Sequence, residues 1–340
     1  MEINWGMIGC GSVSELKSGP AFSKVPHSKL LAVMRRNLLL AKDYALRHNV
    51  KNYYSDATEL LNNPKINAVY VATPPDTHAT YAIQAMKAGK AVYVEKPMAR
   101  TYAECLEMIS VSEETGMPLH VAYYRRTLPA FLKVKELVES NAIGKPLTVN
   151  VKLHKPMRES DKTPENQSWH LKPEISGAGY FYDLASHQFD YLDFLFGPIT
   201  SAQGIASNIG GYYEVEDTVS AIFTFASGVV GSGSWCFVVD KNSEEDYIEI
   251  KGTEGEITFS TFNVEDVILK TKDKTEAFSI QNPENIQFNL INQLVQSLRT
   301  GSECVSTMYS AARTSQVIEQ IVKDYYSHRK AGIKAEAELK

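Results

Sequence analysis

The chain has 340 residues, of which 44% are hydrophobic and 22% are charged, and its formal net charge is -5. This composition is typical of a globular protein, and the length favours two domains. The mildly acidic balance, without a long basic run, argues against nucleic acid or a membrane surface as a partner. A small neutral or polar ligand fits this balance better.

The four cysteines are isolated from one another, with no C-x-x-C pair and no spacing typical of a metal site. They stand at Cys10, Cys105, Cys236 and Cys304. We therefore expect free thiols in a reducing compartment and no bound metal. No apolar stretch reaches the ~18 residues of a membrane span. The first predicted strand begins near residue 2, which leaves no room for a signal peptide and favours the cytoplasm.

Short apolar strands alternate with amphipathic helices in the first part of the chain. Strands are predicted at residues 3–9, 29–35, 66–73, 91–94 and 118–124. Helices are predicted at residues 13–25, 38–48, 57–61, 76–89 and 103–115. This alternation predicts an α/β Rossmann domain over residues 1–122, in which helices cover both faces of a doubly wound parallel sheet.

The pattern then changes to strands that follow one another through short turns. Helices are predicted at residues 128–140, 182–196, 285–299 and 307–328, with a polar loop over 156–179. Strands are predicted at residues 147–155, 219–227, 228–239 and 264–272, and two more within 246–260. The pattern indicates an α+β domain with a large, mostly antiparallel open sheet over residues 123–330. Residues 331–340 are expected to be a tail.

A glycine-rich turn follows the first strand. Gly9 and Gly11 match a dinucleotide fingerprint, and Ser14 replaces its third glycine. The first glycine allows a tight turn and the second lets the backbone approach a pyrophosphate. A plain structural turn is the alternative. The residues expected to contact the cofactor here are Gly9, Cys10, Gly11, Ser12 and Val13.

Two arginines, Arg35 and Arg36, end the second strand, where an acidic residue would bind the ribose hydroxyls of NAD. Guanidinium groups instead favour the 2′-phosphate of NADP through charge-assisted, forked hydrogen bonds. NADP(H) is therefore the expected cofactor, with NAD as an open alternative. A solvated basic turn would also explain the pair.

Two further stretches are specific enough to indicate a family. "TPPDTHATYAIQAMKAGKAVYVEKP" covers residues 73–97, and "GAGYFYDLASHQFDYLDFLFGP" covers residues 177–198. The matching elements are Thr73-Pro74, His78, Ala88-Gly89-Lys90, Glu95-Lys96-Pro97, and Asp183 with His187 in a D-x-x-x-H arrangement. Together with the glycine-rich start, they make the chain resemble the Gfo/Idh/MocA oxidoreductases over nearly its whole length.

The resemblance implies a Rossmann domain that binds NAD(P), and a substrate-binding and oligomerisation domain over residues 123–330 whose open sheet forms a homodimer or homotetramer. It also implies a dehydrogenase or reductase that acts on sugars, polyols and related alcohols. A cis bond before Pro97 would aim Lys96 into the active site. Further cofactor contacts are expected from Thr73, Pro74, Pro75, His78, Glu95, Lys96 and Trp169. Alternatively, His78 merely begins a helix, and Glu95 is a solvated residue at the end of a strand.

Moving a hydride off an alcohol carbon also requires removal of the hydroxyl proton. Asp183 and His187 lie four residues apart and share one face of a helix, which suits a carboxylate that orients an imidazole base. Lys96 would stabilise negative charge on the reacting oxygen or act as an alternate acid. We expect these three residues to be catalytic. The alternative is an ordinary i,i+4 pair on a surface helix.

Substrate contacts are predicted more loosely. Tyr124 stands where the family often has Asn, and Arg125 follows it at the end of the last Rossmann strand. Arg125 could bind substrate oxygens or form a structural salt bridge. The residue after Trp169 is His170 rather than the Arg of a Trp-Arg pair found in NADP-using sugar reductases of the family. His154 and Tyr180 complete the predicted substrate contacts.

The leading hypothesis is an oxidoreductase, NADP(H)-preferring, for a carbohydrate or polyol alcohol/carbonyl pair. A second enzyme hypothesis keeps NAD(P) bound and recycles it while a glycoside is cleaved or a sugar epimerised. A non-catalytic NAD(P)-binding sensor is the hypothesis of another class. Loss of the catalytic residues would favour the sensor, yet Lys96, Asp183 and His187 are all present.

Overall fold

A computed structural model describes residues 1–338, with side chains as far as residue 327. The chain divides into two compact units. The first unit holds residues 1–128 and 282–312, and the second holds residues 129–281 together with those from 313 onward.

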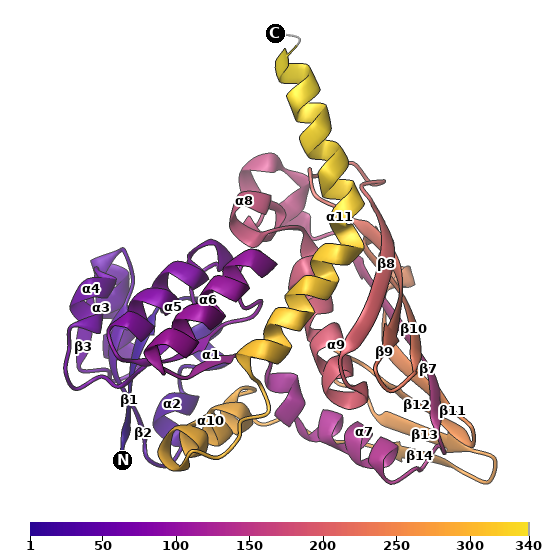
Figure 1. Cartoon of the computed structure of the whole chain (residues 1–340), viewed down its shortest axis with the longest axis horizontal. Coiled ribbons are helices and arrows are strands. Elements are labelled where there is room, and N and C mark those ends of the chain that lie inside the picture. Colours follow the sequence, from indigo (N-terminus) through magenta and orange to yellow (C-terminus); the bar gives the residue numbers. More distant parts are fainter. Residues whose placement is uncertain (339–340) are drawn as a thin grey trace. The chain divides into compact units, whose positions relative to one another are not determined.

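The first unit contains a six-stranded sheet in which every strand pair is parallel (Figure 1, indigo to purple). Its strands are β1 (Ile3–Ile8), β2 (Ser28–Met34), β3 (Asn52–Tyr54), β4 (Ala68–Val71), β5 (Ala91–Val94) and β6 (Leu119–Val121). The strand order is β3-β2-β1-β4-β5-β6. Loops that follow β2, β1, β4 and β5 therefore lie along one edge of the sheet, beside one another.

Helices cover both faces of this sheet. They are α1 (Ser12–Leu16), α2 (Ala21–Lys24), α3 (Leu38–Arg47), α4 (Ala57–Leu61), α5 (His78–Lys87), α6 (Tyr102–Thr115) and α10 (Phe288–Thr300). On one face, Val69 and Val71 of β4 belong to the core cluster under α4, α5 and α6. On the other face, the ring of Tyr70 packs 5.0 Å from that of Phe22 on α2. Burial on both faces explains why β4 and β5 are continuous apolar runs.

The single helix predicted over residues 13–25 is wrong, because the chain forms α1 and α2 with a turn between them. Gly19 lies so close to Ser14 that an added Cβ would stand 2.2 Å from the Ser14 carbonyl oxygen. Pro20 then serves as the N-cap of α2. A proline lacks the N–H that a continuous helix needs at this point, so the helix restarts.

Residues 282–312 cluster with the first unit, although the sequence had suggested a second domain that runs through this segment. The reason lies in polar contacts. Gln287 donates to Glu95 at 2.6 Å and accepts from Tyr93 at 2.9 Å. Asn285 accepts from Lys24 at 2.7 Å. These contacts tie the start of α10 to the Rossmann sheet and to α2.

The second unit contains an eight-stranded sheet, in which only the β7–β10 pair is parallel (Figure 1, magenta to orange). Its strands are β7 (Pro146–Pro156), β8 (Ile199–Ser207), β9 (Thr218–Phe225), β10 (Val230–Val239), β11 (Glu245–Gly252), β12 (Gly255–Phe259), β13 (Val267–Thr271) and β14 (Thr275–Phe278). The order is β14-β13-β12-β11-β7-β10-β9-β8. The predicted fold class, a Rossmann domain plus an α+β domain with a large open sheet, is confirmed.

One face of this second sheet is covered by helices (Figure 1). The helices of the unit are α7 (Pro129–Glu139), α8 (Pro173–Ser176), α9 (Tyr180–Phe196) and α11 (Met308–Glu338), of which α11 begins in the first unit. In β9 the inward side chains are buried, while Ile222 on the other face is 60% exposed. The predicted tail over 331–340 is helical as far as Glu338, and its last two residues lie outside the described part of the chain. None of the helices within residues 1–338 has the length and hydropathy of a membrane span.

Candidate active site

Gly9 and Gly11, in the glycine-rich turn after β1, have different surroundings. Gly9 has a φ of +96°, and an added Cβ would lie 2.7 Å from the carbonyl carbon of Ala72. Only glycine fits there. At Gly11 the nearest atom to an added Cβ is 4.0 Å away. The space beside Gly11 is open, so the protein's own packing does not explain this glycine, whereas a closely approaching pyrophosphate does. The residues present thus fit a dinucleotide.

Ser14, which stands in place of the third glycine, is buried and binds back into the turn. Its Oγ donates to the Gly11 carbonyl oxygen at 2.8 Å. The Ser14 carbonyl oxygen in turn accepts from the Tyr44 hydroxyl of α3 at 2.9 Å. Burial raises the pKa of that tyrosine to about 12, so the donor stays neutral. Serine therefore fixes the glycine turn through hydrogen bonds.

Arg35 and Arg36 lie exposed just beyond the carboxyl end of β2. Because β2 pairs with β1, they stand next to the glycine turn, and Arg35 Nη1 lies 3.4 Å from the Cys10 carbonyl oxygen. Within the part of the chain whose side chains are described, neither guanidinium forms an ion pair with a carboxylate. Both charges are therefore available to an anionic group at this edge.

His78 begins α5 and is almost fully buried between two loops at the same edge. Its Nε2 lies 2.7 Å from the Thr73 carbonyl oxygen after β4, and its Nδ1 lies 3.0 Å from the Pro97 carbonyl oxygen after β5. Burial lowers the pKa of His78 below its usual value. The imidazole thus connects the loop of Thr73, Pro74 and Pro75 to the loop that carries Lys96.

Glu95 and Lys96 follow β5 directly. Glu95 is 6% exposed and accepts hydrogen bonds from the Tyr70 hydroxyl at 2.5 Å, from Gln287 at 2.6 Å, and from the Lys96 backbone N–H at 3.1 Å. This burial rules out a solvated strand end. Lys96 is partly buried, and its bond to Pro97 is cis.

Tyr124 and Arg125, which follow β6, are both buried in the first unit. The Arg125 guanidinium lies 5.1 Å from the centroid of the Tyr124 ring and donates to its hydroxyl at 3.1 Å. The next residue, Arg126, donates to the Val305 carbonyl oxygen at 2.8 Å. This arginine is therefore structural, while Arg125 and Tyr124 form one buried pair.

The Asp183–His187 pair lies on α9 of the second unit. Asp183 is partly exposed, and its Oδ2 lies 3.7 Å from His170 Nε2. His187 is only 3% exposed and packs edge-on against Phe262, with 5.9 Å between the ring centroids. His170 also stacks on Trp169, at 3.7 Å. The pair is thus embedded in ring contacts, and is not an ordinary solvated pair on a surface helix.

Tyr180 and His154 have different surroundings. The Tyr180 hydroxyl donates to buried Asp161 at 2.6 Å, and burial raises the pKa of this tyrosine above its usual value. His154 lies on β7, where Nε2 is 3.0 Å from Ser234 Oγ and Nδ1 is 3.4 Å from Glu245. Partial burial and nearby Lys152 lower the His154 pKa. Its contacts are with neighbouring strands.

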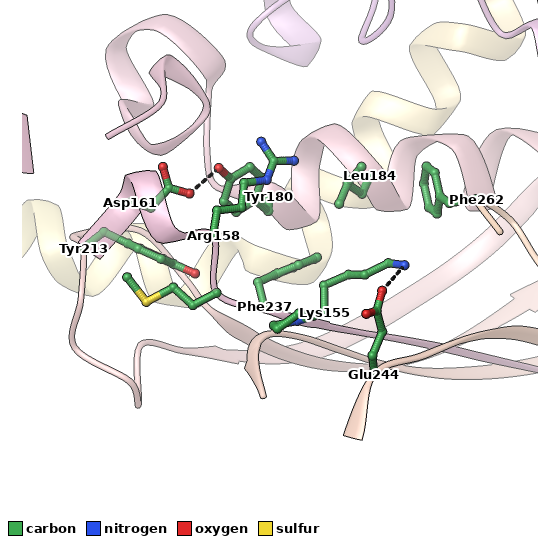
Figure 2. A pocket seen from close by; sticks show the side chains of 11 residues that line it. Lys155, Arg158, Asp161, Tyr180, Leu184, Tyr213, Phe237, Glu244 and Phe262 are labelled. Atoms are coloured by element: carbon green, nitrogen blue, oxygen red, sulfur yellow. Dashed lines mark hydrogen bonds and ion pairs between the residues drawn. The ribbon is translucent and has the colours of Figure 1, made fainter. Parts of the chain in front are cut away.

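A cavity of about 320 Å³ lies in the second unit, between the end of β7, the start of α9 and the end of β10 (Figure 2). Its lining consists of Lys155, Pro156, Met157, Arg158, Asp161, Tyr180, Leu184, Tyr213, Phe237, Glu244 and Phe262. Of the predicted site residues only Tyr180 lines it. Asp183 adjoins the cavity through its chain neighbour Leu184, and His187 through its contact with Phe262.

Metal ligands are not gathered anywhere in the described residues, where no cluster of three or more His, Cys, Asp or Glu side chains could hold an ion. None of the four cysteines, all of which lie in the described part of the chain, forms a disulfide. Burial raises the pKa of Cys10, in the glycine turn, to about 11, which keeps that thiol protonated and unreactive at neutral pH.

Comparison with known families agrees with both units. Residues 3–123 match the model of an oxidoreductase family with an NAD-binding Rossmann fold, and residues 131–258 match the GFO/IDH/MocA C-terminal domain. The chain belongs to the Gfo/Idh/MocA family of oxidoreductases. The resemblance inferred from the sequence motifs is confirmed, as is the expectation of an enzyme. The first unit carries the NAD-binding Rossmann domain of this family.

Several Gfo/Idh/MocA relatives match over most of their length. An oxidoreductase of Formosa agariphila is 36% identical over 320 residues, which cover 94% of this chain and 98% of the relative. The levoglucosan dehydrogenase of Pseudarthrobacter phenanthrenivorans is 30% identical over 293 residues, which cover 76% and 74%. The 1,5-anhydro-D-fructose reductase of Ensifer adhaerens is 27% identical and covers 74% of each chain.

Solved structures of similar proteins show the same fold. A levoglucosan dehydrogenase in complex with NADH has a TM-score of 0.85 at 24% identity, covering 95% of this chain and 96% of that one. An oxidoreductase from Thermotoga maritima has a TM-score of 0.83 at 25% identity, with the same coverage.

Proposed function

We propose that this protein transfers a hydride between NADP(H) and the alcohol or carbonyl carbon of a sugar or polyol. One observation carries the proposal: the glycine turn after β1, the arginine pair after β2 and the Lys96 loop after β5 all lie at the same edge of one Rossmann sheet. Curated relatives named as a levoglucosan dehydrogenase and an anhydrofructose reductase support a carbohydrate substrate. Four cysteines that form no disulfide suit the cytoplasm, where we propose that the enzyme works.

The bound nicotinamide would accept or supply the hydride. In the oxidative direction the substrate hydroxyl loses its proton to His187 as the C–H bond gives up a hydride, and a carbonyl group results. In the reductive direction His187 returns the proton to the forming alkoxide. Packing against Phe262 would help to orient the His187 ring for this proton transfer.

Asp183 and Lys96 would act by charge. Asp183 is partly exposed, and its carboxylate would accept a substrate hydroxyl and orient the His187 imidazole one turn away. Lys96 would stabilise negative charge on the reacting oxygen. The engaged carboxylate of Glu95 and the two-loop contact of His78 would keep Lys96 in position.

Removal of the arginine pair tests the cofactor preference. In Arg35→Ala/Arg36→Ala we expect the Kd for NADPH to rise about 10–100-fold, since charge-assisted hydrogen bonds to a phosphate are lost. The Kd for NADH should change little, because NADH has no 2′-phosphate. Fluorescence titration with both cofactors measures the two values.

The control for this titration is Lys29→Ala, which removes an exposed cation at the other end of the same strand. It should bind both cofactors like the wild type. Equal or stronger wild-type binding of NADH would contradict the NADP preference, and screens for polyol oxidation would then use NAD.

The outer face of the second sheet is our proposed oligomer interface. Three apolar side chains lie exposed there, Ile205 at 77%, Ile222 at 60% and Val230 at 51%, on adjacent strands β8, β9 and β10.

A charge at the centre of this face should prevent association of two copies of the protein. Light scattering should show a dimer or tetramer for the wild type and a smaller species for Ile222→Glu. Ile209→Glu, at an exposed position after β8, is the control. A monomeric wild type would refute the interface.

A further inference from the structure

The cavity of the second unit has walls that suit a sugar ring. The Tyr180 and Phe237 rings lie 5.8 Å apart, and Phe262 and Leu184 complete an apolar lining (Figure 2). Aromatic faces pack against the C–H groups of a pyranose, and a volume of about 320 Å³ is sufficient for one such ring. The walls alone do not discriminate between a neutral and a charged sugar.

Three of the charged side chains at the cavity already have hydrogen-bond or ion-pair partners. Glu244 pairs with Lys155 at 2.8 Å. Asp161 is fully buried and accepts from the Tyr180 hydroxyl at 2.6 Å and from the Ser168 N–H at 3.1 Å. These two carboxylates and the lysine are therefore already engaged by other groups.

Arg158, the remaining charged side chain at the cavity, contacts an aromatic ring. Its guanidinium lies 4.4 Å from the centroid of the Tyr180 ring, over which it is spread (Figure 2). The residue is exposed, and no carboxylate within the described side chains forms an ion pair with it. Contact with the ring holds the planar guanidinium group at the cavity, while its N–H donors stay available to a ligand. A forked guanidinium is the group best matched to a carboxylate or sulfate.

Tyr213 supplies a second unengaged donor. The side chain is 7% exposed, and its hydroxyl has no hydrogen-bond partner in the described part of the protein. In Figure 2 this hydroxyl points into the cavity. Buried hydroxyl groups are normally paired. Burial raises the pKa of Tyr213 above its ordinary value, so that it remains a neutral donor.

We propose that this cavity binds the anionic substituent of an acidic sugar, a carboxylate or a sulfate ester, through Arg158 and Tyr213. This inference rests on the proposed function, and it names the chemical class of the substrate. The cavity adjoins the candidate acid/base pair: Phe262 contacts His187, and Leu184 follows Asp183 in the chain. A sugar that occupied it would contact Phe262 and Leu184, which adjoin that pair.

Direct binding tests the proposal without the need for turnover. The full-length protein is titrated calorimetrically, with saturating NADPH present, with D-glucuronate, D-galacturonate and D-mannuronate and with the matching neutral aldoses. The 6-sulfates of glucose and galactose form a second arm. We expect at least one acidic sugar to bind tenfold or more tightly than its neutral counterpart. Tightest binding of a uronate assigns a carboxylate, and tightest binding of a sulfate ester assigns a sulfate. Either result supports the site.

Variants then locate the anion. Arg158→Gln should weaken binding of the preferred acidic sugar at least tenfold, and Arg158→Lys, which keeps the charge but loses the fork, should weaken it less. Tyr213→Phe should weaken it about threefold. Lys162→Gln removes an exposed cation of the same segment and should bind like the wild type. Thermal unfolding checks that each variant is folded. If Arg158→Gln does not fold, Arg158→Lys takes its place in the test.

Two results would overturn the proposal. One is a wild type that binds no acidic sugar more tightly than its neutral counterpart. The other is an equal loss of affinity in Arg158→Gln and Lys162→Gln. Failure of the proposed function is a separate result. Sugar-acid binding that depends on Arg158, without turnover of any sugar, would leave the site standing and refute hydride transfer.

Discussion

Substitution of His187 by asparagine (His187→Asn) is expected to lower kcat by about 10²–10⁴-fold, the usual contribution of a positioned general acid or base. Asparagine preserves polarity and approximate size at this buried place on α9, but it cannot take up the proton of the substrate hydroxyl. Asp183→Asn should cost less, because it removes an orienting charge and leaves the base in place. Steady-state rates in both directions measure these effects.

The pH profile separates a chemical role of His187 from a merely structural one. Loss of the base should remove the ionisation that governs kcat in the wild type, whereas a packing defect would lower the rate at every pH alike. His27→Asn, a change at an exposed histidine of the first unit, is the control and should behave like the wild type. Nearly full activity of His187→Asn, together with loss of activity in Lys96→Met, would transfer the proton role to Lys96.

The second large effect is expected at the glycine turn, where Gly9→Ala should destabilise the protein. A φ of +96° costs any residue with a Cβ about 1–3 kcal/mol, and the new atom would also collide with the Ala72 carbonyl group. The loop must then shift, so cofactor binding should fall as well. Thermal unfolding and cofactor titration measure both losses.

Gly11→Ala is the matched comparison, two residues along the same turn. Its added Cβ meets nothing closer than 4.0 Å, so the unfolding temperature should match that of the wild type. The Kd for the cofactor should nevertheless rise about tenfold or more, because the methyl group occupies the space where the pyrophosphate approaches the backbone. Wild-type affinity in Gly11→Ala would mean that the cofactor does not pass this glycine.

Features that depend on local patterns could be predicted from the sequence. The tight turn at Gly9, the exposed arginines after β2 and the continuous apolar runs of β4 and β5 each follow from a few adjacent residues. The break between α1 and α2 also had a local cause, in Gly19 and Pro20, yet the amphipathic pattern concealed it. Local chemistry therefore determined most of the first unit.

Features that depend on distant residues could not be predicted. Gln287 binds Glu95 across 192 positions in the chain, and nothing near either residue indicates the other. The cavity combines Arg158, Tyr213 and Phe237 from three separate segments. Phe237 could be recognised as an inward residue from the alternation of β10, but Tyr213 lies in a turn region without periodicity. Only the tertiary structure reveals Arg158 and Tyr213 as unengaged donors at one cavity.

Hydride transfer by this protein can be followed directly with an isotope. NADPH deuterated at the transferable C4 position is incubated with the wild-type protein and a panel of sugar carbonyl compounds, neutral and acidic, and the products are analysed by mass spectrometry and NMR. If the protein transfers a hydride to a sugar, deuterium should appear on the new carbinol carbon of at least one product and should be lost in His187→Asn. Tight NADPH binding without deuterium transfer to any of the sugars would refute hydride transfer and favour a non-catalytic sensor.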